Sequence, residues 1–344
     1  MNVRKSILKQ YRRYSGKEPV EIVPLPLSGS DRRYFRIVER ERTFIGVYNP
    51  NQEENNTFIG FSKHFASLSL PVPSIYEYFP EIDIYFLQDL GDTNLYTWLD
   101  NKRQTAGFKK ELVRMYRKVL DKLLLFQTEG IRGLDLDLCY PHRIFDRQSM
   151  MWDVNYFKYM FLKLVAAPFN EKRLERDFNT LADFLLEAGN DYFLYRDFQS
   201  ANIMIIENEP WFIDYQGGRK GSPQYDAASL LFDAKALLPP SLRELLLEYY
   251  VDEFSKMTGR DPEWFRKYYP AFCLIRIMQA LGAYGFRGLI EHKPGFAASI
   301  IPAVNDILSI ISEKRPAIDL PELFSVIQSI PGLPGYRNLK EKGK

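Results

Sequence analysis

Three oxygen-bearing side chains stand at a spacing that could hold a metal ion and move a proton. In the stretch LYRDFQSANIMII, Asp197 is followed five residues later by Asn202 and then by an apolar run, and Asp214 ends a second apolar run, WFID. Moving a phosphoryl group from a nucleotide needs a carboxylate that orients or deprotonates the accepting hydroxyl, and oxygen ligands that hold Mg²⁺ against the phosphates. Magnesium usually takes only one or two carboxylates from the protein. The three side chains match these needs, so the pattern favours phosphoryl transfer.

The elements around these residues must bring them together. Asp and Asn are common turn formers, so each side chain taken alone indicates a turn rather than a site. The apolar runs NIMII and WFI flank the polar segment ENEP and predict a β-hairpin. A hairpin returns its far end to its start, and we therefore expect Asp214 to approach Asn202.

The composition limits the class of protein. A chain of 344 residues with 46% hydrophobic residues can bury a sizeable core and is long enough for two lobes. A formal net charge of only +2 argues against a dedicated nucleic-acid binder. Cys139 and Cys273 are far apart and no CxxC is present, so no disulfide framework is expected. No signal-peptide core and no long apolar run occur, which predicts a cytoplasmic protein without a membrane span.

The chain divides into two regions of different pattern. Up to about residue 90, short strand-like runs such as RYFRIV and TFIGVY alternate with turns. A basic amphipathic helix is predicted near Val3 to Tyr14, and Phe58, Phe61, Phe65 and Leu68 share one face of a second helix. Helical patterns dominate the rest. We therefore predict one lobe over residues 1–90 and a helical lobe over residues 91–344.

The segment YRDFQSANIMI…WFIDYQ resembles the catalytic loop and metal-binding Asp of the protein-kinase-like fold. More closely, the chain resembles the aminoglycoside phosphotransferase family, and within it the bacterial anomeric kinases of N-acetylmuramate and N-acetylglucosamine. Four further stretches carry the likeness: SGSDRRYFRI, FLQDLGDTNLYTWL, WDVNYFKYMF and IDYQGGRKGSPQYDAASLLFD. The resemblance implies an α+β, bilobal fold with a small mixed β-sheet in the N-terminal lobe and a mainly helical C-terminal lobe.

The resemblance also implies roles for the polar residues. Asp197 would be the catalytic base, and Asn202 and Asp214 would hold Mg²⁺. Asp226 is expected to anchor the catalytic loop, and Tyr195, where such loops usually carry His, to pack or hydrogen-bond beneath it. ATP would be covered by the segment Ser28, Gly29 and Ser30, and its adenine would meet backbone groups of Gln88, Asp89 and Leu90.

One expected residue is missing from the nucleotide site. The strand that usually supplies a phosphate-binding Lys is FIGVYNP, which contains no Lys or Arg. The arginines of SGSDRRYFRI, Arg32, Arg33 and Arg36, could supply the charge instead, and we expect Arg32 or Arg36 to bind the nucleotide. This departure, together with Tyr195, leaves open a nucleotide-binding regulator that lacks efficient turnover.

The acceptor is expected to lie near Asp197 in the helical lobe. Residues 139–176 hold seven Lys or Arg and four acids, which disfavours a polycationic aminoglycoside and suits a neutral or anionic sugar. We expect Asp153 and Gln199 to contact this sugar, although Asp153 could equally be a helix cap. A choline-type kinase stays open because the many aromatic residues could form a cation cage. A functional partnership with a nucleotidyltransferase also stays open.

Overall fold

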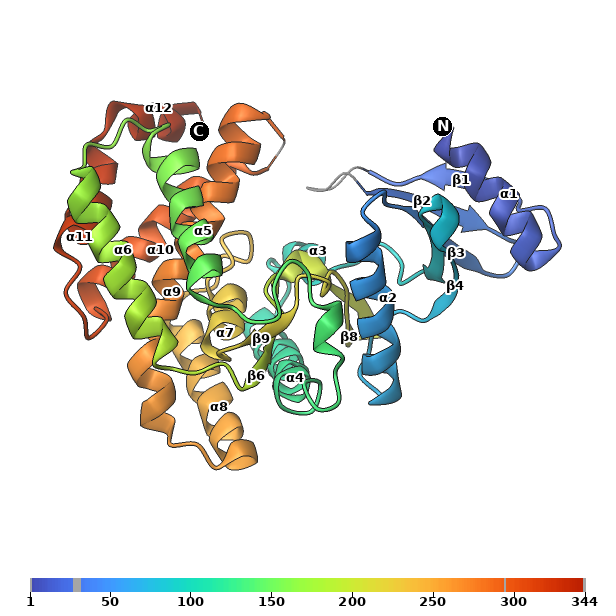
Figure 1. The fold of residues 1–344 in the computed structure, drawn as a ribbon, viewed down its shortest axis with the longest axis horizontal. Coiled ribbons are helices and arrows are strands. Elements are labelled where there is room, and N and C mark those ends of the chain that lie inside the picture. Colours follow the sequence, from blue (N-terminus) through green and yellow to red (C-terminus); the bar gives the residue numbers. More distant parts are fainter. Residues whose placement is uncertain (1, 27–31, 294, 343–344) are drawn as a thin grey trace.

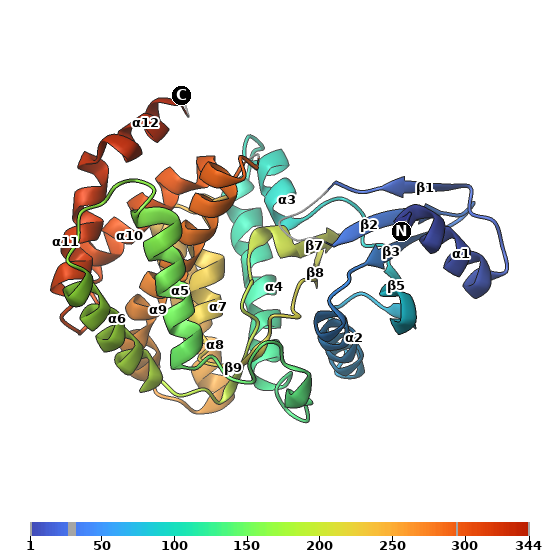
Figure 2. The same cartoon turned by 45° about the horizontal axis from the view of Figure 1, so that its top comes forward.

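The computed structural model describes residues 2–26, 32–293 and 295–342. A five-stranded sheet with two helices lies on one side of the molecule, and a larger helical part lies on the other (Figure 1). The α+β architecture predicted from the sequence is confirmed. The two parts meet around the short strands that carry the catalytic loop, and Figure 2 shows these strands between the helices and the sheet.

The sheet is built from the first five strands in the order β1-β2-β3-β5-β4. Every pairing is antiparallel, where the sequence had suggested mixed directions. The predicted hairpin of RYFRIV and TFIGVY is present as β2 and β3, with Phe35 opposite Gly46. The strand bounds are β1 (Glu21–Pro24), β2 (Arg33–Val38), β3 (Thr43–Tyr48), β4 (Ile75–Phe79) and β5 (Ile84–Gln88).

Two helices pack against the sheet through separate clusters of buried side chains. Helix α1 (Val3–Ser15) contributes Ile7 and Tyr11 to one cluster, and α2 (Gln52–Ser67) contributes Phe61 to the other. Gly46 is needed for the approach of α1, because a Cβ at that position would lie 3.1 Å from the Ile7 side chain. The sheet is therefore held from both sides, which fixes the strands that border the site.

The helical part is organised around one long central helix, α9, which packs against α5, α7 and α10. Two π-helical turns, η3 (Lys158–Leu162) and η5 (Gly285–Ile290), continue α5 and α9. The helix bounds are α3 (Leu95–Lys102), α4 (Phe108–Thr128), α5 (Arg147–Phe157), α6 (Glu171–Leu186), α7 (Gln224–Leu231), α8 (Pro240–Thr258), α9 (Pro262–Tyr284), α10 (Ile300–Glu313), α11 (Pro321–Ser329) and α12 (Pro334–Lys342).

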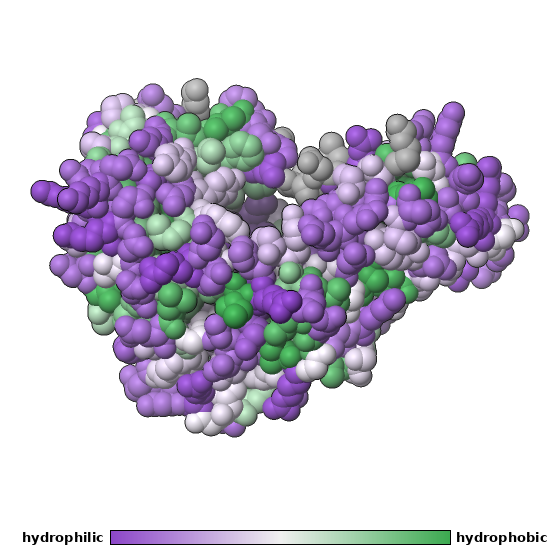
Figure 3. All heavy atoms as spheres, in the orientation of Figure 1, coloured by the Kyte–Doolittle hydropathy of each residue, from purple (hydrophilic) through white to green (hydrophobic). Residues whose placement is uncertain are grey.

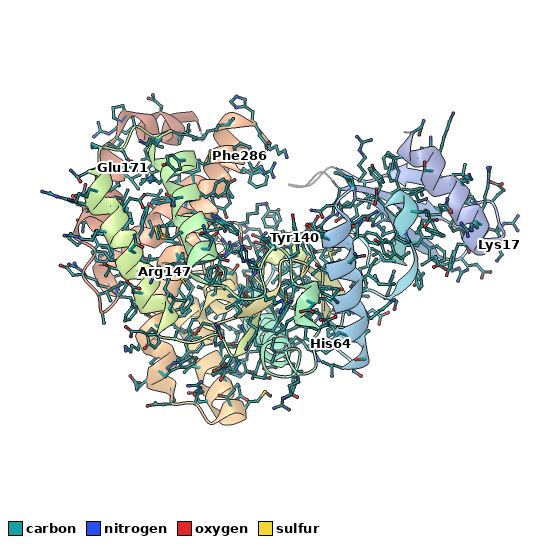
Figure 4. The ribbon with its side chains drawn as sticks, viewed as in Figure 1. Lys17, His64, Tyr140, Arg147, Glu171 and Phe286 are labelled. Atoms are coloured by element: carbon teal, nitrogen blue, oxygen red, sulfur yellow. The ribbon has the colours of Figure 1, made fainter. Side chains whose placement is uncertain are left out.

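Glycines let α9 and the α5–η3 segment approach closely. A Cβ on Gly285 would lie 1.7 Å from the Met160 carbonyl oxygen, and one on Gly282 would meet the Tyr156 ring at 2.8 Å. No larger residue fits these positions without moving the backbone. This crossing fixes the wall of the helical part that faces the opening between the two parts, where Phe286 lies at the edge (Figure 4).

Four short strands in the helical part hold the predicted site. The predicted hairpin is β7 (Ile203–Ile206) and β8 (Glu209–Phe212). Its turn is only Glu207 and Asn208, both with positive φ, rather than the four residues ENEP. The pairing of β6 (Tyr192–Leu194) with β9 (Arg219–Gly221) was not predicted, because strands of three residues carry no readable alternation.

Across the described ranges, none of the helices combines the length and apolar character needed to cross a membrane.

Candidate active site

The loop between β6 and β7 is held from beneath by a buried carboxylate. Asp226, in the first turn of α7, accepts hydrogen bonds from the backbone N–H groups of Tyr195 at 2.7 Å and Arg196 at 2.9 Å. Gln127 of α4 donates to the same carboxylate at 3.2 Å. Burial raises the pKa of Asp226 to about 7, even though these three donors favour the charged form. The expected anchoring role of Asp226 is thus confirmed by its contacts.

Tyr195 ties the same loop to the second strand of the hairpin. Its ring is fully buried, and its hydroxyl donates to the Ile213 carbonyl at 2.7 Å. Because Ile213 directly precedes Asp214, this bond links the segment of Asp197 to that of Asp214. Tyr195 therefore packs and hydrogen-bonds beneath the loop, as expected for the residue in this position.

Asn202 hydrogen-bonds to both of the other predicted residues, Asp197 and Asp214. Its amide nitrogen donates to the Asp197 backbone carbonyl at 2.9 Å and to Asp214 Oδ2 at 3.1 Å. Asp214 has φ of +70°, a left-handed conformation that is uncommon outside glycine, and Gln216 donates to its Oδ1 at 2.7 Å. The structure thus brings together the residues predicted to bind metal.

The donor set fits Mg²⁺. Asn202 presents an amide oxygen that accepts no hydrogen bond from the described residues, while its nitrogen is already used. The Asp214 side chain is 35% exposed, and its carboxylate can accept more contacts than the three it makes. Two hard oxygen ligands on adjoining segments are what a protein usually supplies to this ion.

The Asp197 carboxylate is left free to act as a base. Within the described chain, no side chain or backbone group donates a hydrogen bond to it. Burial and the neighbouring charge of Asp214 raise its pKa, while Arg276 and Arg196 oppose the rise. A desolvated carboxylate without a hydrogen-bond donor accepts a proton more readily than a solvated one.

Arg32 is a buried cation that contacts the predicted metal ligand Asp214. Its guanidinium donates to Asp214 Oδ1 at 3.0 Å and pairs with Glu54 in the first turn of α2. Asn51 fixes that turn, because its side chain caps α2 by accepting from the Glu54 N–H at 3.1 Å. Arg32 is only 5% exposed. It directly precedes β2, the strand that pairs with the Lys-free strand β3.

A cleft of about 460 Å³ lies beside these residues, bounded by both parts of the molecule. The space-filling view is hollowed between the two parts (Figure 3). The lining of the cleft combines polar and apolar side chains and includes Arg32, Arg36, Ile45, Leu87, Gln88, Asp89, Leu90, Met204, Asn202, Ile213 and Asp214. This mixture suits an aromatic base joined to phosphates.

The residues predicted to bind the nucleotide all border the cleft where they are described, but they differ in whether their side chains are already paired. Gln88, Asp89 and Leu90 line the cleft as expected. Arg36 also lines it, but its guanidinium is engaged by Asp89, with Nε to Oδ2 at 2.6 Å, and by Asp92. Burial would raise the pKa of Asp89, but the hydrogen bonds from Arg36, Thr43 and a backbone N–H outweigh it and lower the pKa.

Part of the predicted phosphate cover lies outside the described residues, since Ser28, Gly29 and Ser30 belong to the segment 27–31. Their expected contacts with the triphosphate stay a prediction.

The two residues predicted to contact the acceptor, Asp153 and Gln199, do not line this cleft. Asp153 of α5 is 5% exposed and forms an ion pair with Arg196, whose Nη1 lies 2.7 Å from Asp153 Oδ2. Arg196 also donates to the Tyr225 hydroxyl at 2.7 Å. Gln199 lines a small cavity against α7 and α9. Neither contact with an acceptor is tested by the structure, and both stay predictions.

The sequence matches the phosphotransferase enzyme family (APH) over residues 21–266. The chain belongs to this family. The match covers the sheet, the catalytic loop and the helices up to the start of α9. The protein is therefore a phosphotransferase that acts on a hydroxyl of a small molecule.

Two relatives carry a more specific name. An N-acetylmuramate/N-acetylglucosamine kinase of Pseudomonas aeruginosa is 25% identical over 319 residues, which are 91% of this chain and 89% of that protein. The protein of the same name from Neisseria meningitidis serogroup B is 23% identical over 272 residues, 77% of each chain. The resemblance noted in the sequence is thus confirmed at the level of the family and its relatives.

Solved structures share the fold at lower identity. Choline kinase LicA from Streptococcus pneumoniae superposes with a TM-score of 0.59 at 14% identity, covering 90% of this chain and 100% of that one. A thermostable mutant of aminoglycoside phosphotransferase APH(4)-Ia, in a ternary complex with ADP and hygromycin B, gives a TM-score of 0.56 at 15% identity, covering 91% and 100%. These similarities support the protein-kinase-like fold.

Two residues of the site were not foreseen. Glu54 pairs with Arg32, and Gln216 donates to Asp214. Gln216 could have been found from its place two residues after the predicted metal ligand. Glu54 carries no such signal, because its partner is set by packing of α2 against the sheet.

Proposed function

We propose that the protein is a kinase that transfers the γ-phosphate of ATP to the anomeric hydroxyl of an amino sugar, N-acetylmuramate or N-acetylglucosamine. The observation that carries the transfer is the convergence of Asp197, Asn202 and Asp214, with Asn202 bonded to both other segments. The choice of sugar is supported by the names of the two relatives. In this proposal residues 1–90 form the nucleotide-binding lobe, and residues 91–344 carry the catalytic loop and the acceptor site.

The nucleotide would occupy the cleft between the two parts. Its adenine would lie among the apolar lining side chains, where the Asp89 carbonyl and the Leu90 N–H make no hydrogen bond to another described residue. Arg32 would contact the phosphates. Asn202 and Asp214 would hold Mg²⁺, which supplies positive charge against the phosphate oxygens when it is bound.

Asp197 would act on the acceptor. It accepts the proton of the anomeric hydroxyl while that oxygen bonds to the γ-phosphorus, and the bond from the γ-phosphorus to the β–γ bridging oxygen breaks to release ADP. Asp226 and Tyr195 keep the loop in place during this step. The product would be a sugar 1-phosphate, and the partnership with a nucleotidyltransferase, which would consume such a product, stays a prediction.

The test is direct detection of the product. Purified protein is incubated with Mg-ATP and each sugar, and the sugar 1-phosphate is sought by mass spectrometry. A panel with choline and an aminoglycoside covers the other small-molecule kinases. ATP binding without transfer to any acceptor would replace the proposal with a nucleotide-binding regulator.

Asp197→Asn tests the role of the base. The variant should bind Mg-ATP with unchanged affinity and lose at least about a thousandfold in kcat, because the amide cannot accept the proton. Near-normal turnover by this variant would remove Asp197 from the proposed step.

A further inference from the structure

Arg276 is a buried cation beside the catalytic loop. It lies on α9 and is 7% exposed, with Nε donating to Ser229 Oγ at 2.8 Å and Nη1 donating to Gln279 Oε1 at 2.9 Å. Ser229 lies on α7 three residues after Asp226, one helical turn further along the same face. The element that anchors the catalytic loop therefore also orients Arg276.

No carboxylate in the described chain lies within 4.0 Å of the Arg276 guanidinium, and its Nη2 makes no hydrogen bond there. Two other poorly exposed arginines of the helical part have carboxylate partners, Arg196 with Asp153 and Arg243 with Asp306, whereas the buried Arg219 donates to the carbonyls of Gly217 and Tyr140. A buried charge without a directly bonded counter-ion is costly, and the charge of Arg276 acts only at longer range on the carboxylates of Asp197 and Asp226. A ligand anion at Nη2 would supply the direct ion pair that Arg276 lacks.

Arg276 reaches the acceptor side of the loop rather than the nucleotide cleft. It lines a small cavity together with Gln199, which follows Asp197 by two residues, and with Asp233. Asp233 is already used by the loop, since it accepts from the Ser200 N–H at 2.9 Å and from the Lys235 N–H at 3.0 Å. The cavity of about 10 Å³ admits a group of about the size of one water, such as a carboxylate oxygen, and not a sugar ring.

We propose that Arg276 binds the carboxylate of an acidic acceptor and thereby distinguishes an acidic amino sugar from its neutral counterpart. The inference rests on the proposed function. N-acetylmuramate and N-acetylglucosamine form a matched pair for it, because the first is the second with a lactyl ether that carries a carboxylate. The remaining Nη2 donor of Arg276, and its guanidinium charge without a direct ion pair in the described chain, are complementary to that group.

The test compares both sugars in Arg276→Gln and the wild type. The variant should raise the KM for N-acetylmuramate about 10- to 100-fold, the usual effect of losing a charge-assisted hydrogen bond, and change that for N-acetylglucosamine less than about twofold. Arg276→Lys keeps the charge and should restore part of the preference. The KM for Mg-ATP should not change, because Arg276 does not line the nucleotide cleft.

Two control variants separate recognition from packing. Arg243→Gln removes another poorly exposed arginine of the helical part, one with its own carboxylate, and should affect both sugars equally. Arg219→Gln removes a buried arginine whose donors reach the carbonyls of Gly217 and Tyr140, and should also leave the ratio of the two sugars unchanged. Equal losses on both sugars in Arg276→Gln, or a change of the ratio in Arg219→Gln alone, would overturn the proposal.

Binding calorimetry tests the role of Arg276 independently of the proposed function. Turnover of either sugar by the wild type tests the function itself. Direct binding of the two sugars to wild type and Arg276→Gln tests the arginine even where no phosphate is transferred. Preferential loss of N-acetylmuramate binding supports the assignment, and unchanged binding of that sugar contradicts it.

Discussion

At the scale of single residues, we propose that Arg32 supplies the phosphate-binding charge that β3 lacks. It is the cation that contacts both Glu54 and the predicted metal ligand Asp214. Arg36, another expected candidate, pairs with Asp89 and Asp92. Both arginines are paired with two acids, but Arg32 bonds to the predicted metal ligand and Arg36 does not, so we expect Arg32 rather than Arg36 to contact the phosphates.

Arg32→Ala should therefore weaken nucleotide binding more than the same substitution at Arg33 or Arg36. We expect the KM for Mg-ATP to rise about 10- to 100-fold, because the variant loses charge-assisted contacts to the phosphates and leaves Glu54 without its partner. Arg33→Ala is the matched control, since Arg33 is exposed on β2. Steady-state kinetics at varied Mg-ATP measure both variants, and a larger effect at Arg33 or Arg36 than at Arg32 would contradict this assignment.

At the scale of elements, α7 sets the position of the catalytic loop through a single buried side chain. Asp226 holds the backbone N–H groups of Tyr195 and Arg196, and the pKa of its carboxyl is raised from 3.8 to about 7 because it is buried. A carboxyl that is harder to ionise in the native state binds more protons there than in the unfolded chain. Its contribution to the free energy of unfolding is therefore largest below pH 4 and is lost as the pH rises to about 7.

Asp226→Asn tests whether the contribution of Asp226 to the free energy of unfolding falls with pH, because the amide does not titrate. The free energy of unfolding of the wild type minus that of the variant should fall by about 1 kcal/mol for each pH unit between pH 5 and 7, and level off above. Urea unfolding at pH 5, 6, 7 and 8 gives the difference. A difference that grows with pH would mean that the three N–H donors stabilise the ionised carboxylate more than burial opposes it. The variant should also lose kcat, because the N–H groups of Tyr195 and Arg196 face different oxygens of Asp226 and asparagine would present an NH2 donor to one of them.

At the scale of the whole molecule, the sequence predicted the contacts between residues that are close along the chain. Asp214 approaches Asn202 because one tight hairpin joins them, and the apolar pattern of that hairpin is visible in the sequence. The α+β class followed from the same kind of pattern. The Arg32–Asp214 contact joins positions 182 residues apart, and Arg276 depends on the crossing of α7 and α9. Such contacts are set by the packing of distant elements, which no local pattern records.

The same long-range contact makes the two parts of the molecule respond together to nucleotide. Arg32 lies beside the sheet and Asp214 beside the catalytic loop, so a ligand that contacts both should stabilise the whole chain. At a concentration of Mg-ATP about 100 times its Kd, the gain should be about 2.7 kcal/mol and the Tm should rise by several degrees. Calorimetric melting with Mg-ATP, and with ATP in EDTA, separates the part of this rise that needs the metal.

Asp214→Ala should abolish that metal-dependent part, because it removes one of the two oxygen ligands proposed for Mg²⁺. Asp183→Ala is the matched control: Asp183 is an exposed acid of α6, paired with Arg147 and absent from the cleft lining, and its loss should leave the response to Mg-ATP unchanged. If Asp214→Ala kept the full metal-dependent rise in Tm, the ion would be held elsewhere. Because the Tm responds to binding and not to turnover, this outcome is independent of which sugar accepts the phosphate.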